Sequence, residues 1–290
     1  MTRPAIALSI AGSDPSGGAG IQADLKTFSA LGVYGAAAIT ALTAQNTRAV
    51  TAVQAIPPSF VRAQIEAVLS DLPVDAIKLG MLESAAVIHA VADALQAVPQ
   101  IPVVLDPVML SKSGAPLLAP EAVEALRRRL LPRASVLTPN LPEAAALLGL
   151  SETAALGADP TTSPGPAADP ALVALCRRLR DLGAQAVVLK GGHIDPQGPR
   201  SDDFFWDGTF PMRLVAPRIA TRNTHGTGCT YAAAITAGLA QGESVRSAVV
   251  SARQYVQQAI VAGAALRIGD GHGPLHHFAA LWPPSVHRGS

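Results

Sequence analysis

The sequence predicts an α/β protein with a mostly parallel central sheet, in which short strands alternate with helices along the chain. Two observations support this prediction. Short aliphatic runs with the length of buried strands alternate with longer stretches that have the apolar spacing of helices. The chain also contains 49 % hydrophobic but only 4 % aromatic residues, so aliphatic side chains must build the core. Its 290 residues suffice for one large layered domain.

Six aliphatic runs are predicted to form the parallel strands, because each is short and is followed by a helical pattern. The predicted strands cover residues 5–12, 35–46, 75–82, 102–109, 134–143 and 186–193. The predicted helices cover residues 20–31, 59–71, 84–97, 120–131, 142–149, 170–182, 227–240 and 244–264. The stretch 202–217 has the pattern of an antiparallel pair, with a turn at Asp207-Gly208.

The chain is expected to form a single domain, 1–290, because strand and helix patterns continue after the Pro- and Gly-rich stretch 157–170. We expect that stretch to be an exposed loop and 284–290 to be a frayed tail. A formal net charge of +1 gives no reason to expect nucleic acid or membrane partners, and no run approaches the ~18 apolar residues of a membrane span. Two cysteines are too few for a disulfide framework, which indicates a cytoplasmic protein.

The ends of the predicted strands indicate where a ligand binds. All six runs end in glycine or polar residues, and the carboxyl ends of parallel strands share one edge of the sheet. In open α/β sheets, ligands bind outside this edge. The sequence therefore predicts a ligand-binding α/β protein before any motif is considered.

The glycine-rich segment after the first strand partly matches two known nucleotide-binding motifs. Residues 18–23 match the dinucleotide fingerprint, but the second strand ends in Thr-Ala-Gln-Asn, where an acidic residue for the ribose is expected. The segment "GSDPSGGAG" also lacks the lysine of a P-loop. Its glycines are therefore expected to let the backbone approach a small ligand.

Asn140 and Glu143 open a helix directly after a strand, and two interpretations stay open. In the first, Asn140 caps the helix and Glu143 lies in its first turn. In the second, Glu143 is a carboxylate on the magnesium side of a site, together with Asp106 at the end of a neighbouring strand. Lys190, at a strand end beside two glycines, could belong to a simple turn, but its charge favours phosphate binding.

Cys229 follows Gly226, Thr227 and Gly228 where a helix begins. Backbone amides at such a helix start bind anions. The helix dipole and these amides are expected to lower the pKa of the Cys229 thiol, which favours a functional role over simple packing. Cys176 lies within a helical pattern and is expected to be buried and inert.

These segments together resemble one family. The stretches "AGSDPSGGAGIQADLKTFSALG", "TALTAQNT", "KLGML", "VLDPVMLSKSG", "LTPNLPEA", "LKGGH" and "NTHGTGCT" are similar to those of bacterial hydroxymethylpyrimidine/phosphomethylpyrimidine kinases of thiamine biosynthesis, in the ribokinase superfamily. The resemblance runs from about residue 5 to about residue 278. It implies a three-layer α/β/α sandwich without a separate lid domain, usually as a homodimer.

The resemblance also implies an activity and a set of site residues. ATP and Mg²⁺ would serve to phosphorylate 4-amino-5-hydroxymethyl-2-methylpyrimidine, and then its monophosphate to the diphosphate. The pyrimidine site would contain Ala19, Asp24, Gln45, Met81 and Val108. The ATP and magnesium side would contain Asp106, Asn140, Glu143, Lys190, Thr224, Thr227 and the turn Gly226–Gly228.

The chemistry of two of these side chains agrees with the resemblance. The amide of Gln45 offers a donor beside an acceptor, the complement of an aminopyrimidine edge. Cys229 stands where sugar kinases of the superfamily usually carry an aspartate as the base. We hypothesise that the thiol is a thiolate toward the hydroxyl substrate and neutral toward the monophosphate, whose dianion a fixed carboxylate would repel.

The sequence leaves three other functions as alternatives. A pyridoxal kinase of the same superfamily is the nearest, since some relatives also carry a cysteine after Gly-Thr-Gly. A non-catalytic pyrimidine-binding protein is the second, although it would not need phosphate-binding groups. An NAD-dependent enzyme is the third, and the absent acidic residue speaks against it.

Overall fold

The structure is a computed structural model that describes residues 3–110, 117–119, 121–156, 170–194 and 197–282. All but the last residue of the expected loop at 157–170 lies outside the described residues, and so does the expected tail at 284–290. None of the helices in these ranges has the length and hydropathy needed to cross a bilayer.

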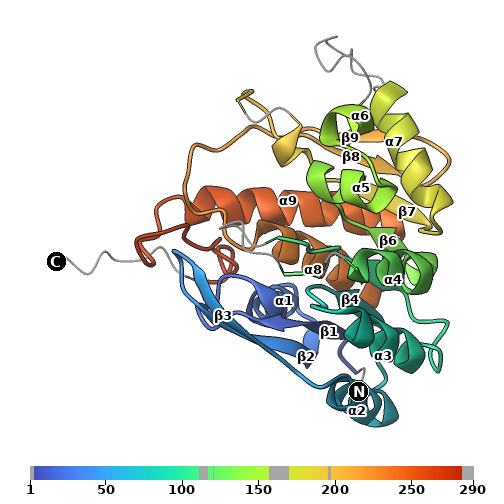
Figure 1. Cartoon of the computed structure of the whole chain (residues 1–290). Helices are drawn as coiled ribbons and strands as arrows, with labels where there is room; N and C mark the ends of the chain where they lie inside the picture. Colours follow the sequence, from blue (N-terminus) through green and yellow to red (C-terminus); the bar gives the residue numbers. More distant parts are fainter. Residues whose placement is uncertain (1–2, 111–116, 120, 157–169, 195–196, 283–290) are drawn as a thin grey trace.

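A sheet of nine strands, counted over the described ranges, forms the centre of the molecule (Figure 1). Its order is β3-β2-β1-β4-β5-β6-β7-β8-β9, and the six strands from β2 to β7 are parallel. The outer strands β3, β8 and β9 run antiparallel to their neighbours. The strands are β1 (Ile6–Ser13), β2 (Tyr34–Gln45), β3 (Val50–Ala55), β4 (Ala76–Leu79), β5 (Val103–Leu105), β6 (Val136–Leu137), β7 (Ala186–Leu189), β8 (Asp203–Trp206) and β9 (Met212–Leu214).

Helices cover both faces of this sheet and make the three layers that the family resemblance implies. One face packs against α1 (Gly20–Ala30), α8 (Thr227–Ala240) and α9 (Val245–Gly263) through a cluster rich in alanine. The other face packs mainly through leucine, isoleucine and valine. Its helices are α2 (Pro58–Asp71), α3 (Ala85–Leu95), α4 (Ala122–Arg129), α5 (Leu141–Leu148), α6 (Glu152–Leu156) and α7 (Pro170–Asp181).

Because helices cover both faces, the central strands are buried on both sides, and their sequences are continuous apolar runs. All residues of β5, β6 and β7 are buried. β4 reads Ala-Ile-Lys-Leu and is equally buried, although it contains the charged residue Lys78. A buried lysine in such a strand requires a partner, and that partner lies beneath the functional site.

The described chain differs from the predicted elements in two places. β3 forms a hairpin with β2 and has no predicted counterpart, because most of its side chains are exposed and no apolar run marks it. The short helix α6 was not expected either. The predicted antiparallel pair at 202–217 is confirmed as β8 and β9.

Candidate active site

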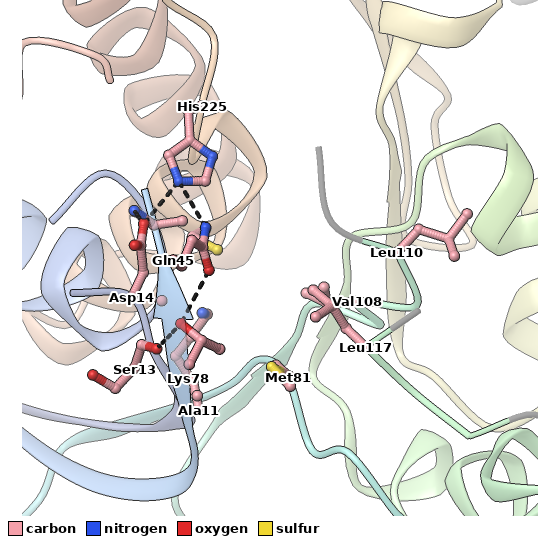
Figure 2. A pocket seen from close by; sticks show the side chains of 15 residues that line it. Ala11, Ser13, Asp14, Gln45, Lys78, Met81, Val108, Leu110, Leu117 and His225 are labelled. Atoms are coloured by element: carbon pink, nitrogen blue, oxygen red, sulfur yellow. Dashed lines mark hydrogen bonds and ion pairs between the residues drawn. The ribbon is translucent and has the colours of Figure 1, made fainter. Parts of the chain in front are cut away.

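A pocket lies at the carboxyl edge of the sheet, where the sequence predicts a ligand site (Figure 2). Its wall is formed by the ends of β1, β2 and β4 and the beginnings of α1 and α8. Four of the five residues expected at the pyrimidine line it, namely Ala19, Gln45, Met81 and Val108. The full lining is Ala11, Gly12, Ser13, Asp14, Ala19, Gly20, Thr43, Gln45, Lys78, Met81, Val108, Leu110, Leu117, His225 and Cys229.

Asp24, the fifth residue expected at the pyrimidine, is not on the pocket wall and has no exposed surface. Its Oδ2 accepts hydrogen bonds from Ser9 Oγ at 2.6 Å and from Lys78 Nζ at 2.8 Å. Burial raises the pKa of Asp24, and the Lys78 ammonium opposes that rise. The carboxylate therefore neutralises a buried lysine that itself lines the pocket, and a direct contact of Asp24 with the pyrimidine stays a prediction.

Asp14 organises the loop between β1 and α1. Its Oδ1 accepts from the Ser16 amide and its Oδ2 from the Ala19 amide, both at 2.9 Å. Oδ2 also lies 2.7 Å from His225 Nε2, on a segment 211 positions later in the sequence. Burial raises the pKa of Asp14, but hydrogen bonds from His225 and Ser16 outweigh that effect and lower it to about 2. Asp14 is therefore an ionised anchor between the two segments.

The turn before α8 is in close contact with this loop. Gly226 has φ +78° and is the N-cap of α8. A Cβ at Gly226 would lie 1.8 Å from the Gly18 carbonyl oxygen, so only glycine fits here. Thr227 Oγ1 donates to the Thr224 carbonyl at 2.8 Å and closes the turn. The Thr227 amide also donates to the Thr224 carbonyl, at 3.3 Å, so the anion-binding donors of this helix start are its neighbouring amides.

Cys229 lies in the first turn of α8 and on the pocket wall, but its ionisation differs from the expected one. Burial raises the pKa of the Cys229 thiol to about 11, although the Lys78 ammonium opposes the rise. The prediction that the helix start lowers this pKa is therefore wrong, because desolvation outweighs the dipole and the backbone amide of Gly20. The thiol is neutral near pH 7. Cys176 is buried, with its pKa raised to about 12, as expected.

A lysine and two carboxylates meet next to the start of α8. Lys190 Nζ lies 2.8 Å from Asp106 Oδ1 and 3.4 Å from Glu143 Oε2. A Cβ at Gly228 would lie 3.3 Å from Lys190 Nζ and 3.5 Å from Asp106 Oδ2. The glycine therefore allows the helix start to approach this cluster. Burial raises the pKa of Glu143, and Lys190 opposes that rise.

Asn140 and Glu143 form a capping box at the start of α5. The Asn140 side chain accepts from the Glu143 amide, and Glu143 Oε2 accepts from the Asn140 amide, both at 2.8 Å. The helix-cap interpretation is confirmed, and the same Glu143 oxygen also faces Lys190. In the described ranges no three His, Cys, Asp or Glu residues form a metal-binding group.

Among the pocket-lining residues that were not expected from the sequence, three carry ionisable side chains, namely Asp14, Lys78 and His225. Each carries a signal that could have been used. Asp14 is the one acidic residue within the glycine-rich segment, and His225 directly precedes Gly-Thr-Gly. Lys78 is a charge inside an otherwise apolar strand, which is rare without a functional or structural partner.

The fold and the site define the class of this protein. It is an α/β protein with a small-molecule pocket at its strand ends and, beside the pocket, a helix start and a lysine of the kind that bind phosphate. Within this class, the chain belongs to the phosphomethylpyrimidine kinase family, whose model matches residues 14–276.

Individual relatives agree with this assignment. The chain is 51 % identical to a hydroxymethylpyrimidine/phosphomethylpyrimidine kinase of Rhizobium meliloti, covering 96 % of this chain and 98 % of that protein. It is 48 % identical to the enzyme of the same name from Escherichia coli, covering 95 % and 98 %. Among solved structures it is similar to an ADP complex of Bacillus subtilis pyridoxal kinase, with a TM-score of 0.82 and 36 % identity over 96 % of this chain and 99 % of that one. This likeness bears out the predicted ribokinase-like fold.

Proposed function

We propose that this protein is an ATP-dependent kinase of thiamine diphosphate biosynthesis. It phosphorylates 4-amino-5-hydroxymethyl-2-methylpyrimidine to the monophosphate, and then the monophosphate to the diphosphate. The observation that carries the proposal is the likeness over 96 % of the chain to an enzyme named for both kinase activities. The geometry supports the proposal, because the pocket that contains the Gln45 side-chain amide lies beside the start of α8, and helix starts of this kind bind phosphate.

The pocket suits a small flat ring with one polar edge. Met81 and Val108 offer apolar contact to the faces of a ring, and Ala19 leaves room beside them. Gln45 offers the donor and acceptor that an aminopyrimidine edge needs. We assign substrate binding to these four residues.

The groups that would meet the transferred phosphoryl lie around Lys190. Phosphoryl transfer depends mainly on positioning and on neutralising charge on the phosphate oxygens. The amides of Gly226 and Gly228 would supply donors at the start of α8, and Lys190 would supply a cation. The Thr227 amide already donates to the Thr224 carbonyl, at 3.3 Å, and holds the turn. Thr224 supports this turn by accepting from Thr227. We assign nucleotide phosphate binding to this group of residues.

Asp106 and Glu143 fit a magnesium site, because Mg²⁺ in such kinases is commonly held by one or two carboxylates together with substrate phosphates. Both side chains are at most 9 % exposed, and both lie within 4 Å of the Lys190 ammonium. Asn140 orients Glu143 through the capping box. A bound Mg²⁺ would neutralise charge on the phosphate oxygens, and we propose these two carboxylates as its protein ligands.

A neutral thiol at Cys229 suits the second acceptor better than the first. A phosphate monoester is mostly ionised near pH 7 and needs no base, and a neutral thiol does not repel its charge. The hydroxyl acceptor of the first step also needs little activation, because the transition state of phosphoryl transfer is loose. The raised pKa does not support the thiolate expected toward the hydroxyl substrate. We propose instead that Cys229 is neutral in both steps and in this form lets one pocket take both acceptors.

We further propose that residues 1–290 form one domain and that the protein works as a homodimer in the cytoplasm. The hairpin of β2 and β3 supports a dimer, since Tyr34, Leu42 and Val53 are each more than 40 % exposed at that end of the sheet. Sedimentation velocity at several protein concentrations tests the dimer, and a single monomeric species throughout would contradict it.

A product assay tests the function. The protein is incubated with ATP, Mg²⁺ and the hydroxymethylpyrimidine, and the products are separated by mass. We expect the monophosphate first and the diphosphate after it. Monophosphate alone would contradict the second step, and no phosphorylated pyrimidine would overturn the assignment.

One alternative substrate needs its own arm of this assay, because the chain is also similar in structure to a pyridoxal kinase. Pyridoxal is offered in place of the pyrimidine under the same conditions. Pyridoxal phosphate as the sole product would favour a pyridoxal kinase. A third arm measures thermal stabilisation by the pyrimidine alone, and stabilisation without any ATP consumption would favour a pure binding protein.

A further inference from the structure

The side chain of Gln45 lies between two polar residues of the pocket wall (Figure 2). On one side its Nε2 is 3.2 Å from His225 Nε2, and on the other side its Oε1 is 3.1 Å from Thr43 Oγ1. The oxygen and the nitrogen of an amide exchange places when the group rotates by 180°. The neighbours therefore decide which end faces which side.

The proton on His225 is determined by Asp14. His225 Nε2 is 2.7 Å from Asp14 Oδ2, which is an ionised carboxylate held by two backbone amides. An unprotonated Nε2 would place two lone pairs against each other at this distance. Nε2 therefore carries a hydrogen and acts as a donor. This single hydrogen is donated to Asp14 Oδ2, and a protonated Nε2 has no lone pair that could accept from the amide nitrogen of Gln45. The amide oxygen, which can share the same N–H, is therefore the end of Gln45 that fits beside His225.

The proton on Thr43 is determined in the same way. Thr43 Oγ1 is 2.8 Å from the Ser13 carbonyl oxygen, which can only accept. The single hydroxyl hydrogen of Thr43 goes to that carbonyl, so Thr43 offers Gln45 a lone pair. A lone pair on Thr43 calls for a donor on Gln45, which is the amide nitrogen. Both neighbours thus select the same orientation.

We infer that Asp14, His225 and Thr43 are positioning residues that fix the polarity of the Gln45 amide, with Oε1 toward His225 and Nε2 toward Thr43, and thereby select pyrimidines with a 4-amino group over 4-oxo analogues. This inference rests on the proposed function. Each end of the amide then keeps one free N–H or lone pair for a ligand in the pocket. A 4-amino group donates to Oε1, and the adjacent ring nitrogen accepts from Nε2.

A 4-oxo ring presents the opposite pattern, because its oxygen accepts and its ring N–H donates. With the amide polarity fixed, both hydrogen bonds of this analogue are mismatched. Sites that hydrogen-bond a substrate reject mismatched analogues strongly, since buried polar groups are left unpaired. We expect the native protein to bind the 4-amino compound roughly 100-fold or more tightly than 5-hydroxymethyl-2-methyl-4-oxopyrimidine.

The test measures two dissociation constants by calorimetry, that of the 4-oxo compound and that of the 4-amino compound, and takes the first divided by the second as the ratio. Three variants on one hairpin are compared with the native protein. Thr43→Val removes the lone pair that selects the amide nitrogen, and Thr43→Ser restores it. Thr51→Val is the matched control, because Thr51 lies on the neighbouring strand, is exposed and donates to the Ala44 carbonyl. We expect the ratio to fall about tenfold or more in Thr43→Val only. His225→Asn, which removes the imidazole beside Gln45, should also lower this ratio of dissociation constants.

A purely structural role of Thr43 would weaken both ligands together and leave their ratio unchanged, which would overturn the inference. A native protein that binds both compounds equally well would overturn it too, even if the pyrimidine is phosphorylated. If the proposed kinase function itself is wrong, the result is distinguishable, because the native protein would then neither bind nor phosphorylate the 4-amino compound.

Discussion

Lys78 Nζ lies 2.8 Å from Asp24 Oδ2, and neither side chain has any exposed surface. The pair lies below the pocket wall, to which Lys78 also contributes. Burial tends to lower the pKa of Lys78, but the carboxylates of Asp24 and Asp106 raise it overall. The lysine is therefore charged, and its charge depends on a buried partner.

Removing one member of this pair should destabilise the protein strongly. Asp24→Asn leaves the Lys78 ammonium without its carboxylate, and breaking a buried pair costs about 3–5 kcal/mol. The double variant Asp24→Leu/Lys78→Met should lose much less than the sum of the single changes. Urea unfolding followed by circular dichroism measures the free energies. Additive losses would show that the two residues do not act as a pair. The exposed pair of Arg62 and Glu66 is the control, and its loss should cost less than about 1 kcal/mol.

Cys229→Asp should affect the two acceptors unequally. A carboxylate in this position would repel the dianionic monophosphate but not the uncharged alcohol. We expect kcat/KM for the monophosphate to fall at least about tenfold further than kcat/KM for the alcohol. Cys229→Ser, which is neutral and similar in size, is the matched control and should preserve the ratio of the two values. Equal losses on both substrates in Cys229→Asp would refute the proposed role of the thiol.

The Cys229 thiol should react slowly with alkylating reagents near neutral pH. The thiolate is the nucleophile, and an ordinary cysteine has a pKa near 8.5, whereas that of Cys229 is raised to about 11. At pH 7.5 its thiolate fraction is then on the order of 100-fold below that of free cysteine. Iodoacetamide labelling in a Cys176→Ala background, followed by mass spectrometry from pH 7 to pH 10, measures the rate. A rate that levels off near pH 8 would contradict the raised pKa.

Asp106→Asn should raise the magnesium requirement of the kinase. The amide keeps the shape of the side chain but removes a charge that would hold the ion. We expect the Mg²⁺ concentration for half-maximal activity to increase about tenfold or more. Glu143→Gln should also raise this Mg²⁺ concentration, because the new amide oxygen can still cap α5 while the charge is lost. Glu66→Gln, on an exposed helix face, should leave the requirement unchanged. An unaltered requirement in Asp106→Asn would place the ion elsewhere.

The layered fold was predictable because local patterns carry it. The runs that became β5, β6 and β7 are apolar along the whole length of each strand, since both faces of a central parallel strand are buried. β3 has no such pattern, because an exposed edge strand needs no apolar residues.

The site could be predicted only in part, because its contacts join distant positions. Strand ends and glycine turns indicated Gln45 and Gly226 from local sequence alone. The partner of Asp24 could not be found in this way, since Lys78 lies on another strand. The expected low pKa of Cys229 failed for a related reason, because the position at the helix start is visible in the sequence and the burial is not.

The contact between Asp14 and His225 joins two segments that are 211 positions apart. It has a consequence for how the protein is made. A chain that is still being synthesised has released the nine strands of the described sheet before the Gly226 turn leaves the ribosome, and until then His225 and Cys229 are missing from the pocket wall. Contacts with such long sequence separation form late and make folding slow. Enzymatic activity therefore begins only when nearly the whole chain is available, and a product truncated before α8 should be inert however well its strands are paired.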